Sequence, residues 1–533
     1  MPLIPSSFPF RILPALTAAA LAGVCALPAL GDEAVPEGTP GAAGGARAAA
    51  DAARTYREAH GPRIIEDFRA FLALPNVASN AQDMAANAGW IEAYLEDRGF
   101  TIQQWSAGGA PYVFAERSAP GAATTLLVYA HFDGQPVEPD EWASPPWEPT
   151  LRTDLVVNGG RVVPWLEARE AVDPAWRVFA RSAGDDKAPV IALAAALDAL
   201  DAAGISPSVN LKLILDGEEE IGSPTLTAIL ERHADALRAD LMLFCDGPMH
   251  QSRRRQLVFG VRGSMTVELT AYGAVRPLHS GHYGNWAPSA NETLIRLLAG
   301  MEDDQGRILI PGYNDAVRPV TSAERAAIDA MPVIDGPLAA SLGLGRTEGN
   351  GARLEELVMK PAIVVKGFAG GGVGDQASNV IRPSATASLN LRLVPDQTPE
   401  TVRPVFEAYL EDRGFHLVES EPDAEILRAH PRVLRIDWRD GGYRGFRTDL
   451  NGPEAVRLAA VLDAMGGEPT LLTPTMGGSL PIYLFEEGLG LPIILLPIAN
   501  HDNNQHGRNE NLRIRNLWDA IEVYAAVLAA YGR

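Results

Sequence analysis

The sequence predicts an α/β protein with a mixed, largely parallel sheet in its main domain, which is interrupted by an inserted α+β domain. Two patterns support this fold class. In the first half of the chain, short apolar runs typical of buried strands alternate with helical segments, as in βαβ units. From about Gly260 the strands alternate apolar and polar residues, which indicates a half-buried, mainly antiparallel sheet.

The first residues are typical of an export signal. Arg11 supplies a positive charge, residues 12–30 are mostly apolar, and residues 29–31 fit the small-x-small pattern of a cleavage site. We therefore expect a signal peptide over residues 1–31 and a mature protein that is exported, to the periplasm or outside the cell. Residues 32–62 are rich in Ala, Gly and Pro, so a flexible linker is expected there.

An uncleaved membrane anchor is the alternative for this N-terminal segment, because its apolar stretch approaches the length of a membrane span. No other long uncharged apolar run follows, so we expect no stable membrane insertion once the signal is removed. The formal net charge of -22 disfavours nucleic acid as a partner. After cleavage only Cys245 remains, which excludes an intramolecular disulfide.

The main domain is expected in two parts, over residues 63–256 and 475–533. Helical spacing of apolar residues predicts its helices, and short apolar or β-branched runs predict its strands. The expected helices are 64–74, one from about 90 that ends at Gly99, 188–203 and 224–237, and the expected strands are 124–130, 209–215, 240–245 and 491–498. Ser223 and Pro224 have the residue types of a helix N-cap and first helical position.

Residues 257–474 are predicted to form the inserted domain. Alternating apolar and polar residues predict strands at 265–271 and 385–394, and helical segments are expected near 291–301 and 399–411. Together these elements predict an α+β domain whose sheet is covered on one face.

Potential metal ligands follow the strands of the main domain. His131 and Asp133 follow one strand, a run of three glutamates follows the next, and Asp246 follows another. The carboxyl ends of the strands in an open α/β sheet form the crevice where ligands bind. Three adjacent acids repel one another unless a positive group shares their site. The pattern therefore predicts a metal or proton-transfer site at this edge.

Six motifs occur together in one order along the chain. They are His131-x-Asp133, Asp185-Asp186-Lys187, Glu219-Glu220, Asp246, Leu278-His279-Ser280-Gly281 and His506-x-x-Asn509-Glu510. This order resembles the co-catalytic zinc metallopeptidases, which include carnosinases, bacterial dipeptidases, glutamate carboxypeptidase, aminoacylase, acetylornithine deacetylase and succinyl-diaminopimelate desuccinylase. The resemblance covers essentially the whole mature chain. It implies a zinc-peptidase catalytic domain, an inserted lid and dimerisation domain, and a homodimer.

The resemblance also implies two Zn(II) ions per chain, with Mn or Co as possible substitutes. His131 and Asp246 would hold one ion, Glu220 and His506 would hold the other, and Asp185 would bridge them. Imidazoles and carboxylates are ligands that zinc binds in proteins. A carboxylate can span two metals that lie about 3.5 to 4 Å apart.

Catalytic roles follow from the same resemblance. Glu219 would be the general base that takes a proton from the attacking water. Asp133 would accept the second N–H of His131 and so fix its tautomer. The peptide bond between Asp185 and Asp186 is often cis in this family. We expect Glu218, the remaining acid of the run, to be solvated.

Substrate contacts are implied for the lid and for a late loop. His279 would reach the neighbouring subunit's site and stabilise the oxyanion. Arg392 would pair with a substrate carboxylate. Gly478 and Ser479 belong to a loop that would contact the same terminal carboxylate. Residues 152–177 are an insertion between the first two motifs at the expected rim of the pocket.

These residues predict a metal-dependent hydrolase that cleaves the amide bond of dipeptides or short peptides next to a free C-terminal carboxylate. A metal-bridging water, activated by Glu219, would be the nucleophile. An N-acyl amino acid deacylase of the same mechanism is the alternative. A non-catalytic binding homologue is a third possibility, but the intact ligand set and Glu219 argue against it.

Overall fold

The computed structural model describes residues 40–168 and 171–533. The expected signal peptide, residues 1–31, and the first part of the expected linker lie outside the described residues. Within the described residues, no helix is both long enough and apolar enough to cross a membrane.

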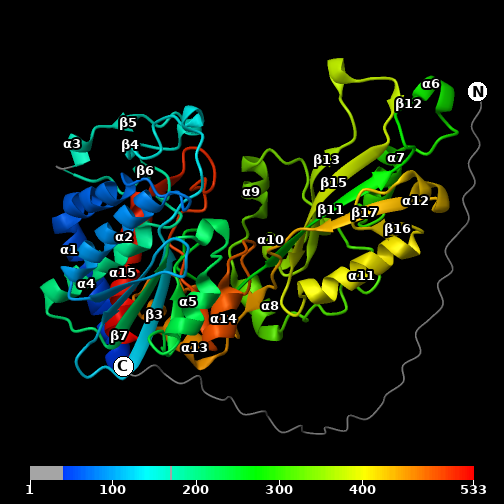
Figure 1. Ribbon diagram of the computed structural model, residues 1–533. Helices are drawn as coiled ribbons and strands as arrows, with labels where there is room; N and C mark the ends of the chain where they lie inside the picture. Colours follow the sequence, from blue (N-terminus) through cyan, green and yellow to red (C-terminus); the bar gives the residue numbers. More distant parts are fainter. Residues whose placement is uncertain (1–39, 169–170) are drawn as a thin grey trace, which may run out of the picture. The chain divides into compact units, whose positions relative to one another are not determined.

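The main domain is built on an eight-stranded mixed sheet (Figure 1). In spatial order its strands are β1 (Thr101–Trp105), β2 (Tyr112–Arg117), β7 (Val209–Asp216), β3 (Thr124–His131), β8 (Leu241–Phe244), β20 (Ile493–Leu495), β9 (Gln256–Val258) and β19 (Leu471–Thr473). The central strands β7, β3, β8 and β20 pair in parallel, whereas β1, β2 and the β9–β20 contact are antiparallel. The mixed, largely parallel sheet is therefore confirmed.

Helices cover both faces of this sheet. One face packs against α1 (Pro40–Leu72), α2 (Ala81–Glu96), α4 (Ala188–Ala203), α13 (Pro453–Ala464) and α15 (Ile514–Ala530), and the other against α5 (Leu226–His233) and α14 (Ile482–Leu489). Strand β3 illustrates the two faces, because Val128 belongs to the first core and its neighbours Leu127 and Tyr129 belong to the second. This alternation follows from the two-residue period of a strand.

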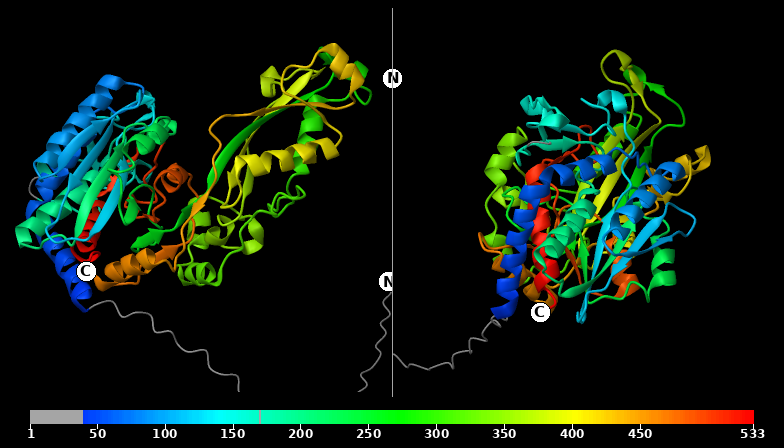
Figure 2. Two further views of the ribbon diagram at one scale, coloured as in Figure 1. Left: turned by 60° about the horizontal axis from the view of Figure 1, so that its bottom comes forward. Right: turned by 90° about the vertical axis from the view of Figure 1, so that its left-hand side faces the viewer.

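The prediction of a flexible linker up to residue 62 was wrong for the described part, because α1 begins at Pro40. Ala46, Ala49, Ala50 and Ala53 are buried, and α1 packs along α15, as Figure 2 shows. Alanine is the best helix former, and its small side chain allows two helices to approach closely. An alanine-rich composition therefore supports a packed helix here instead of a linker.

A smaller four-stranded sheet flanks the main domain. Its strands in order are β21 (Asn511–Arg513), β6 (Arg177–Phe179), β4 (Thr150–Arg152) and β5 (Val162–Val163). The expected insertion at 152–177 supplies β5 and the short helix α3 (Trp165–Ala168). Because β21 follows the loop that carries His506, this small sheet supports that loop.

The inserted domain contains a five-stranded sheet. Its strands in order are β13 (Ala362–Ala369), β15 (Ser384–Leu393), β11 (Gly263–Tyr272), β17 (Val433–Trp438) and β16 (His416–Val418). All pairs are antiparallel except β16 with β17. Helices α7 (Ala290–Ala299) and α11 (Pro399–Asp412) contribute to the core of this sheet. The half-buried antiparallel sheet is as predicted.

The remaining short elements mostly extend this domain. They are β10 (Gly260–Val261), β12 (Leu278–His279), β14 (Val380–Ile381), β18 (Phe446–Arg447), α6 (Ser280–Tyr283), α8 (Ser322–Ala330), α9 (Asp335–Ser341), α10 (Leu354–Leu357) and α12 (Ala424–Ala429). Strands β10 and β18 pair with each other where the chain leaves and re-enters the main domain.

The expected limits of the inserted domain, 257 and 474, are too wide. Strand β19 and all but the first residue of β9 lie inside that range but belong to the main sheet, and α13 packs on α1 and α15. These elements are short or amphipathic in sequence, so nothing local distinguishes them from the inserted domain. Only their spatial partners show that they belong to the main domain. Strands β9 and β19, for example, pair with each other although they lie more than 200 residues apart along the chain.

Candidate metal centre

The expected ligands meet at one edge of the main sheet. His131 is the last residue of β3, Asp246 follows β8, and Glu219 and Glu220 follow β7. Because these strands are parallel, their carboxyl ends lie side by side. Asp185 comes from the turn before α4, where the Asp185–Asp186 peptide bond is cis, as the resemblance implied.

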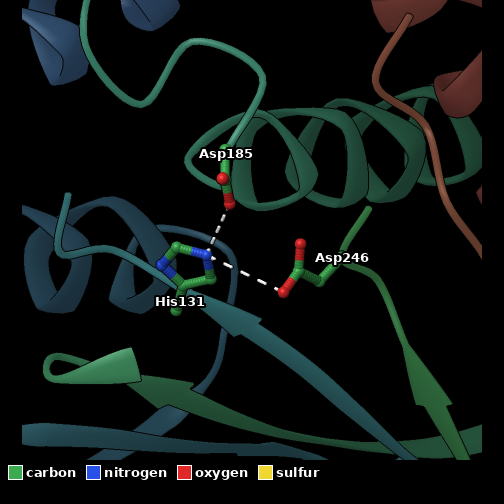
Figure 3. Close-up of side chains that lie close together, drawn as sticks. All are labelled: His131, Asp185 and Asp246. Atoms are coloured by element: carbon green, nitrogen blue, oxygen red, sulfur yellow. Dashed lines mark hydrogen bonds and ion pairs between the residues drawn. The ribbon is translucent and has the colours of Figure 1, made fainter. Parts of the chain in front are cut away.

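The first group of ligands consists of His131, Asp185 and Asp246, all buried (Figure 3). The Nε2 atom of His131 lies 2.8 Å from Oδ1 of Asp185 and 3.8 Å from Oδ2 of Asp246. One imidazole nitrogen and two carboxylate oxygens therefore face a common point.

The second group consists of Asp185, Glu220 and His506. The Nε2 atom of His506 lies 3.1 Å from Oδ2 of Asp185 and 3.3 Å from Oε2 of Glu220. In both groups the ligand atoms lie within 4.8 Å of one another. Asp185 thus turns one oxygen to each imidazole, which is the arrangement of a carboxylate that bridges two metals.

The charges at the site fit divalent cations. Burial and the charge of Asp185 raise the pKa of both Glu220 and Asp246 to about 7. Burial also raises the pKa of Glu219 well above its usual range, with Asp246 and Glu220 adding to the shift. Carboxylates gathered out of water are costly unless cations compensate them. Nitrogen and oxygen donors suit zinc, and also manganese or cobalt.

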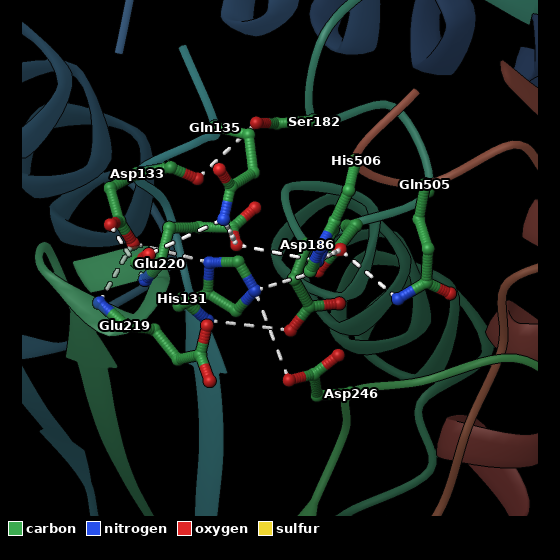
Figure 4. A network of polar contacts seen from close by, with 12 residues as sticks. His131, Asp133, Gln135, Ser182, Asp186, Glu219, Glu220, Asp246, Gln505 and His506 are labelled. Carbon is green, nitrogen blue, oxygen red and sulfur yellow. Dashed lines mark hydrogen bonds and ion pairs between the residues drawn. The ribbon is translucent and has the colours of Figure 1, made fainter. Parts of the chain in front are cut away.

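Asp133 is placed to organise the site through three contacts (Figure 4). Its carboxylate accepts hydrogen bonds from Nδ1–H of His131 at 3.2 Å and from the backbone N–H groups of Glu219 at 3.1 Å and Glu220 at 3.0 Å. The contact with His131 fixes the tautomer that leaves Nε2 free for a metal. The other two contacts hold the short turn that carries both glutamates.

The expectation that Glu218 is solvated was wrong. Its carboxylate is buried and accepts hydrogen bonds from the hydroxyl of Tyr112 at 2.9 Å, the backbone N–H of Ala110 at 3.1 Å, and both the N–H and the hydroxyl of Thr225. A buried carboxylate with four donors is well compensated. These hydrogen bonds fix Glu218 at the start of the short turn that carries Glu219 and Glu220.

The expected helix start at Ser223 and Pro224 was also wrong, because α5 begins at Leu226. Ser223 has a φ of 47°, and its hydroxyl donates to Asp216 Oδ2 at 2.7 Å instead of capping the helix. The acids before it form a short 3-10 turn over Glu219–Ile221. The chain thus needs a tight reversal here before the helix can begin.

Glu510 is a positioning residue for Asp185 that the sequence did not reveal. Its buried carboxylate accepts hydrogen bonds from the guanidinium of Arg181 at 2.7 Å and from the backbone N–H groups of Ser182, Gly184 and Asp185 at 3.0 to 3.1 Å. These contacts hold the turn that presents the bridging aspartate. The motif that contains Glu510 does not predict these contacts, because its partners lie more than 320 residues away along the chain.

Two glutamine amides also contact the ligands (Figure 4). Nε2 of Gln135 donates to Glu220 Oε2 at 2.8 Å, and Nε2 of Gln505 donates to Asp185 Oδ2 at 3.2 Å. Each amide restrains the orientation of one ligand carboxylate, which is a common outer-shell role at metal sites. Neither glutamine was predicted, because a lone glutamine beside a motif has no distinctive pattern.

An ionic cluster supports the loop that carries His506. Asp502 accepts hydrogen bonds from Arg177 at 2.6 Å and from Arg513 at 3.1 Å, and Asn500 donates to it at 2.8 Å. Burial alone would raise the pKa of Asp502, but these arginines hold it well below its usual range. The ion pairs of Asp502 with these two arginines therefore hold the start of the loop that carries His506.

The expected substrate residues also come together in part. Nη1 of Arg392 donates to the hydroxyl of Ser479 at 2.8 Å. Arg262, which was not predicted, donates from its backbone N–H to the carbonyl of Gly478 at 3.1 Å and from Nε to that of Gly477 at 3.3 Å. Burial and the charge of Arg392 lower the pKa of Arg262 to about 10.

Among the described residues, no carboxylate lies within ion-pair distance of either Arg262 or Arg392. Two neighbouring guanidinium groups without an acid favour an anionic ligand. His279 is not brought to this site within the chain: it is exposed, and its Nδ1 accepts from the backbone N–H of Gly281 at 3.1 Å. Its role across a dimer stays a prediction.

The sheet edge, the two ligand groups and the aspartate that they share define a metal-dependent hydrolase. The family model described as peptidase family M20/M25/M40 matches residues 127–530, and the chain belongs to this family.

Relatives of known name resemble nearly the whole chain. A Cys-Gly metallodipeptidase of Candida albicans is 25% identical over 494 residues, covering 89% of this chain and 95% of that protein. The Beta-Ala-His dipeptidase of Homo sapiens is 26% identical over 428 residues, covering 78% of this chain and 76% of that protein. The crystal structure of an M20 family metallo-carboxypeptidase from Sulfolobus solfataricus is 26% identical, with a TM-score of 0.70, covering 88% of this chain and 99% of that one.

Proposed function

We propose that this protein hydrolyses the amide bond of dipeptides or short peptides that end in a free carboxylate, using two divalent metal ions. The observation that carries this proposal is the orientation of Asp185, which turns Oδ1 toward His131 and Oδ2 toward His506. Zinc is the metal that the donor set suits best, and manganese or cobalt would fit the same donors.

His131, Asp246, Glu220 and His506 would hold the metals, with Asp185 between them. When bound, the metals would polarise the scissile carbonyl and make a water molecule more acidic. Every other step belongs to side chains of the protein.

Glu219 is suited to the role of general base. It belongs to neither ligand group, and its carboxylate makes no hydrogen bond within the described residues. Its backbone is held by Asp133 in the turn that also carries Glu220. The free carboxylate would take a proton from the attacking water and deliver it to the leaving nitrogen, a transfer that typically accelerates such a step about 10²- to 10⁴-fold.

Arg392 and Ser479 would bind the free C-terminal carboxylate of the substrate. Their mutual contact at 2.8 Å places a guanidinium and a hydroxyl together, and Arg262 adds a second guanidinium nearby. A planar guanidinium binds a carboxylate through two parallel hydrogen bonds. Substrates with a blocked C-terminus would therefore bind poorly.

An N-acyl amino acid deacylase is the second candidate, because such a substrate also has an amide beside a free carboxylate. The names of the similar proteins favour the peptidase: two are dipeptidases and one is a metallo-carboxypeptidase. Neither candidate changes the roles of the metal ligands or of Glu219.

The test is a substrate panel offered to the full chain loaded with zinc, manganese or cobalt. Cys-Gly, Ala-Ala and β-Ala-His would be compared with N-acetyl-alanine and with the amidated dipeptide Ala-Ala-NH₂. Faster cleavage of the dipeptides, measured as kcat/KM, supports the proposal. Preference for N-acetyl-alanine would assign the deacylase, and cleavage of Ala-Ala-NH₂ as fast as Ala-Ala would overturn the role of the free carboxylate.

A homodimer formed through the inserted domain is also part of the proposal. Strand β13 lies at the edge of the five-stranded sheet, and Val364, Val365 and Phe368 on it are 48%, 49% and 43% exposed. An exposed apolar edge strand is prone to pair with another chain. Light scattering would detect a dimer in the wild type and a monomer after Phe368→Lys.

If His279 acts across this dimer, activity should depend on assembly. A mixture of His279→Ala chains with Glu219→Gln chains would form hybrid dimers that contain one intact composite site. Recovery of activity on mixing supports the role of His279, and no recovery from a verified hybrid contradicts it.

Export to the periplasm or the cell exterior is proposed from residues 1–31 alone. N-terminal sequencing of the protein purified from a fractionated host would test it. A mature terminus near Asp32 in the exported fraction supports cleavage, whereas an intact terminus in the membrane fraction would assign an anchor.

A further inference from the structure

A cavity separate from the metal ligands lies in the main domain. Its volume is about 400 Å³, which is at the lower end of the roughly 300–1,000 Å³ range of small-molecule sites. It is bounded by the loop 249–256, the end of α13, residues 496–498 and the first half of α15. None of the residues that line it belongs to the two ligand groups.

Some charged side chains around this cavity neutralise one another. Arg254 pairs with Glu468 at 3.1 Å, and Glu522 pairs with Arg54 at 2.7 Å and with Arg57 at 3.0 Å. These groups need no ligand. The charged groups without a hydrogen-bonded partner of opposite charge are Arg253, Arg255 and Asp519. Nη2 of Arg255 donates to the backbone carbonyls of Gly466 at 2.6 Å and Glu468 at 3.0 Å, which leaves its other nitrogens for a ligand.

Arg253 and Asp519 form an incomplete pair. Nη2 of Arg253 lies 3.8 Å from Oδ2 of Asp519, which is too far for a hydrogen bond. Burial and the charge of Glu522 raise the pKa of Asp519 to about 6, as expected for a carboxylate without close donors. A guanidinium and a carboxylate held side by side match the ammonium and carboxylate groups of an α-amino acid, which share one carbon atom.

Four buried polar atoms at the cavity make no hydrogen bond within the described residues. They are Nε of Arg253, Nε of Arg254, Nε of Arg255 and Oδ1 of Asn516, and of these only Nε of Arg254 has a charged partner, Oε2 of Glu468 at 3.1 Å. Asn516 is only 2% exposed, and its Nδ2 already donates to the carbonyl of Ile498 at 2.8 Å. Its free oxygen can therefore only accept a hydrogen bond, as an ammonium group would supply.

The remaining walls of the cavity are apolar. Leu462 and Met465 from α13, Leu496 after β20 and Val523 from α15 line it. Of these, Leu462, Leu496 and Val523 are buried. An aliphatic or thioether side chain would be removed from water against them.

We propose that this cavity binds a free α-amino acid with an apolar side chain. Asp519 and Asn516 would receive its ammonium group, Arg253 and Arg255 would bind its carboxylate, and the four apolar residues would surround its side chain. This site is independent of the proposed peptidase activity, since it shares no residue with the metal centre.

The probe is radiolabelled L-leucine, measured by equilibrium dialysis against the full metal-loaded chain. Arg253→Met and Asp519→Asn should each weaken binding about tenfold or more, as expected for the loss of a charge-assisted hydrogen bond. Arg254→Met is the matched control, because Arg254 lines the same cavity but is already paired with Glu468, and it should leave binding unchanged. Thermal melts would confirm that all three variants fold.

Two analogues complete the test. Leucinamide lacks the carboxylate and 4-methylpentanoate lacks the ammonium group, so each should bind at least about tenfold more weakly than leucine to the wild type. Absence of saturable leucine binding at millimolar concentration would overturn the proposal. Binding that Arg253→Met and Asp519→Asn leave unchanged would also overturn it, because the amino acid would then occupy another site.

Discussion

The carboxylate of Asp133 accepts a hydrogen bond from the backbone N–H of Glu219 at 3.1 Å. Because the same carboxylate also holds the imidazole of His131, one buried side chain sets the position of a proposed ligand and of the proposed base. Asp133→Asn should lower metal affinity or activity about 10- to 100-fold, as outer-shell changes commonly do. Metal titration together with kcat/KM would measure this loss.

The control for Asp133→Asn is Glu138→Gln, an exposed acid five residues further along the same loop. That change should alter neither quantity. Equal behaviour of the two variants would contradict the organising role of Asp133.

Glu218 and Glu219 are adjacent, but substitution of Glu218 should reduce stability whereas substitution of Glu219 should reduce activity. In Glu218→Gln, the side-chain N–H₂ would face hydrogen-bond donors, among them the hydroxyl of Tyr112 and the backbone N–H of Thr225. Because donors cannot bond to one another, we expect this change to lower the free energy of unfolding by about 2 kcal/mol. Urea denaturation would measure this change. Unchanged stability would contradict the buried, hydrogen-bonded position of Glu218 and would support the solvated position expected from the sequence.

Arg392 should determine the preference for a free C-terminus. The wild type is expected to cleave Ala-Ala about 10- to 100-fold faster than its amide, because charged hydrogen bonds are lost with the carboxylate. In Arg392→Met the two substrates should be cleaved at similar rates. The kcat/KM of both proteins on both substrates would measure this preference. If Arg392→Met still prefers Ala-Ala, another residue binds the substrate carboxylate.

Asp502 should make stability depend on pH. Arg177 and Arg513 lower its pKa in the folded state, so its contribution is fully present above the unfolded value of about 4 and is lost as the pH falls below it. At pH 7, Asp502→Asn should lower the free energy of unfolding by about 2 kcal/mol, because the buried guanidinium of Arg177 loses its hydrogen-bonded carboxylate and keeps, among the described acids, only Asp154, at 3.9 Å. Unfolding measured from pH 7 to pH 3 should show the difference narrowing; a constant difference would contradict this.

Local patterns were enough to predict much of the fold and to place candidate metal ligands at one edge of the sheet, whereas the resemblance implied how those ligands pair. Helix α4 has the predicted bounds because Gly204, at a φ of 66°, ends it in a left-handed conformation. His131 and Asp246 could be predicted as candidate ligands because each follows an apolar strand directly. The position of a motif at a strand end can be predicted from the few residues of the strand before it.

Features that depend on distant partners could not be predicted. Glu218 is buried by Tyr112, which precedes it by 106 residues, and nothing near Glu218 in the sequence signals that contact. Arg262 joins the proposed substrate site only because it contacts the loop at Gly477. The early part of α1 was missed for another reason, since alanine-rich segments are common to linkers and to closely packed helices.

The most direct test of the central claim is the variant Glu219→Gln, examined for metal content and kinetics together. If Glu219 is the general base, kcat/KM for a dipeptide should fall about a thousandfold while two metal ions per chain and the stability of the fold are retained. Activity within tenfold of the wild type, with both metals bound, would contradict the account.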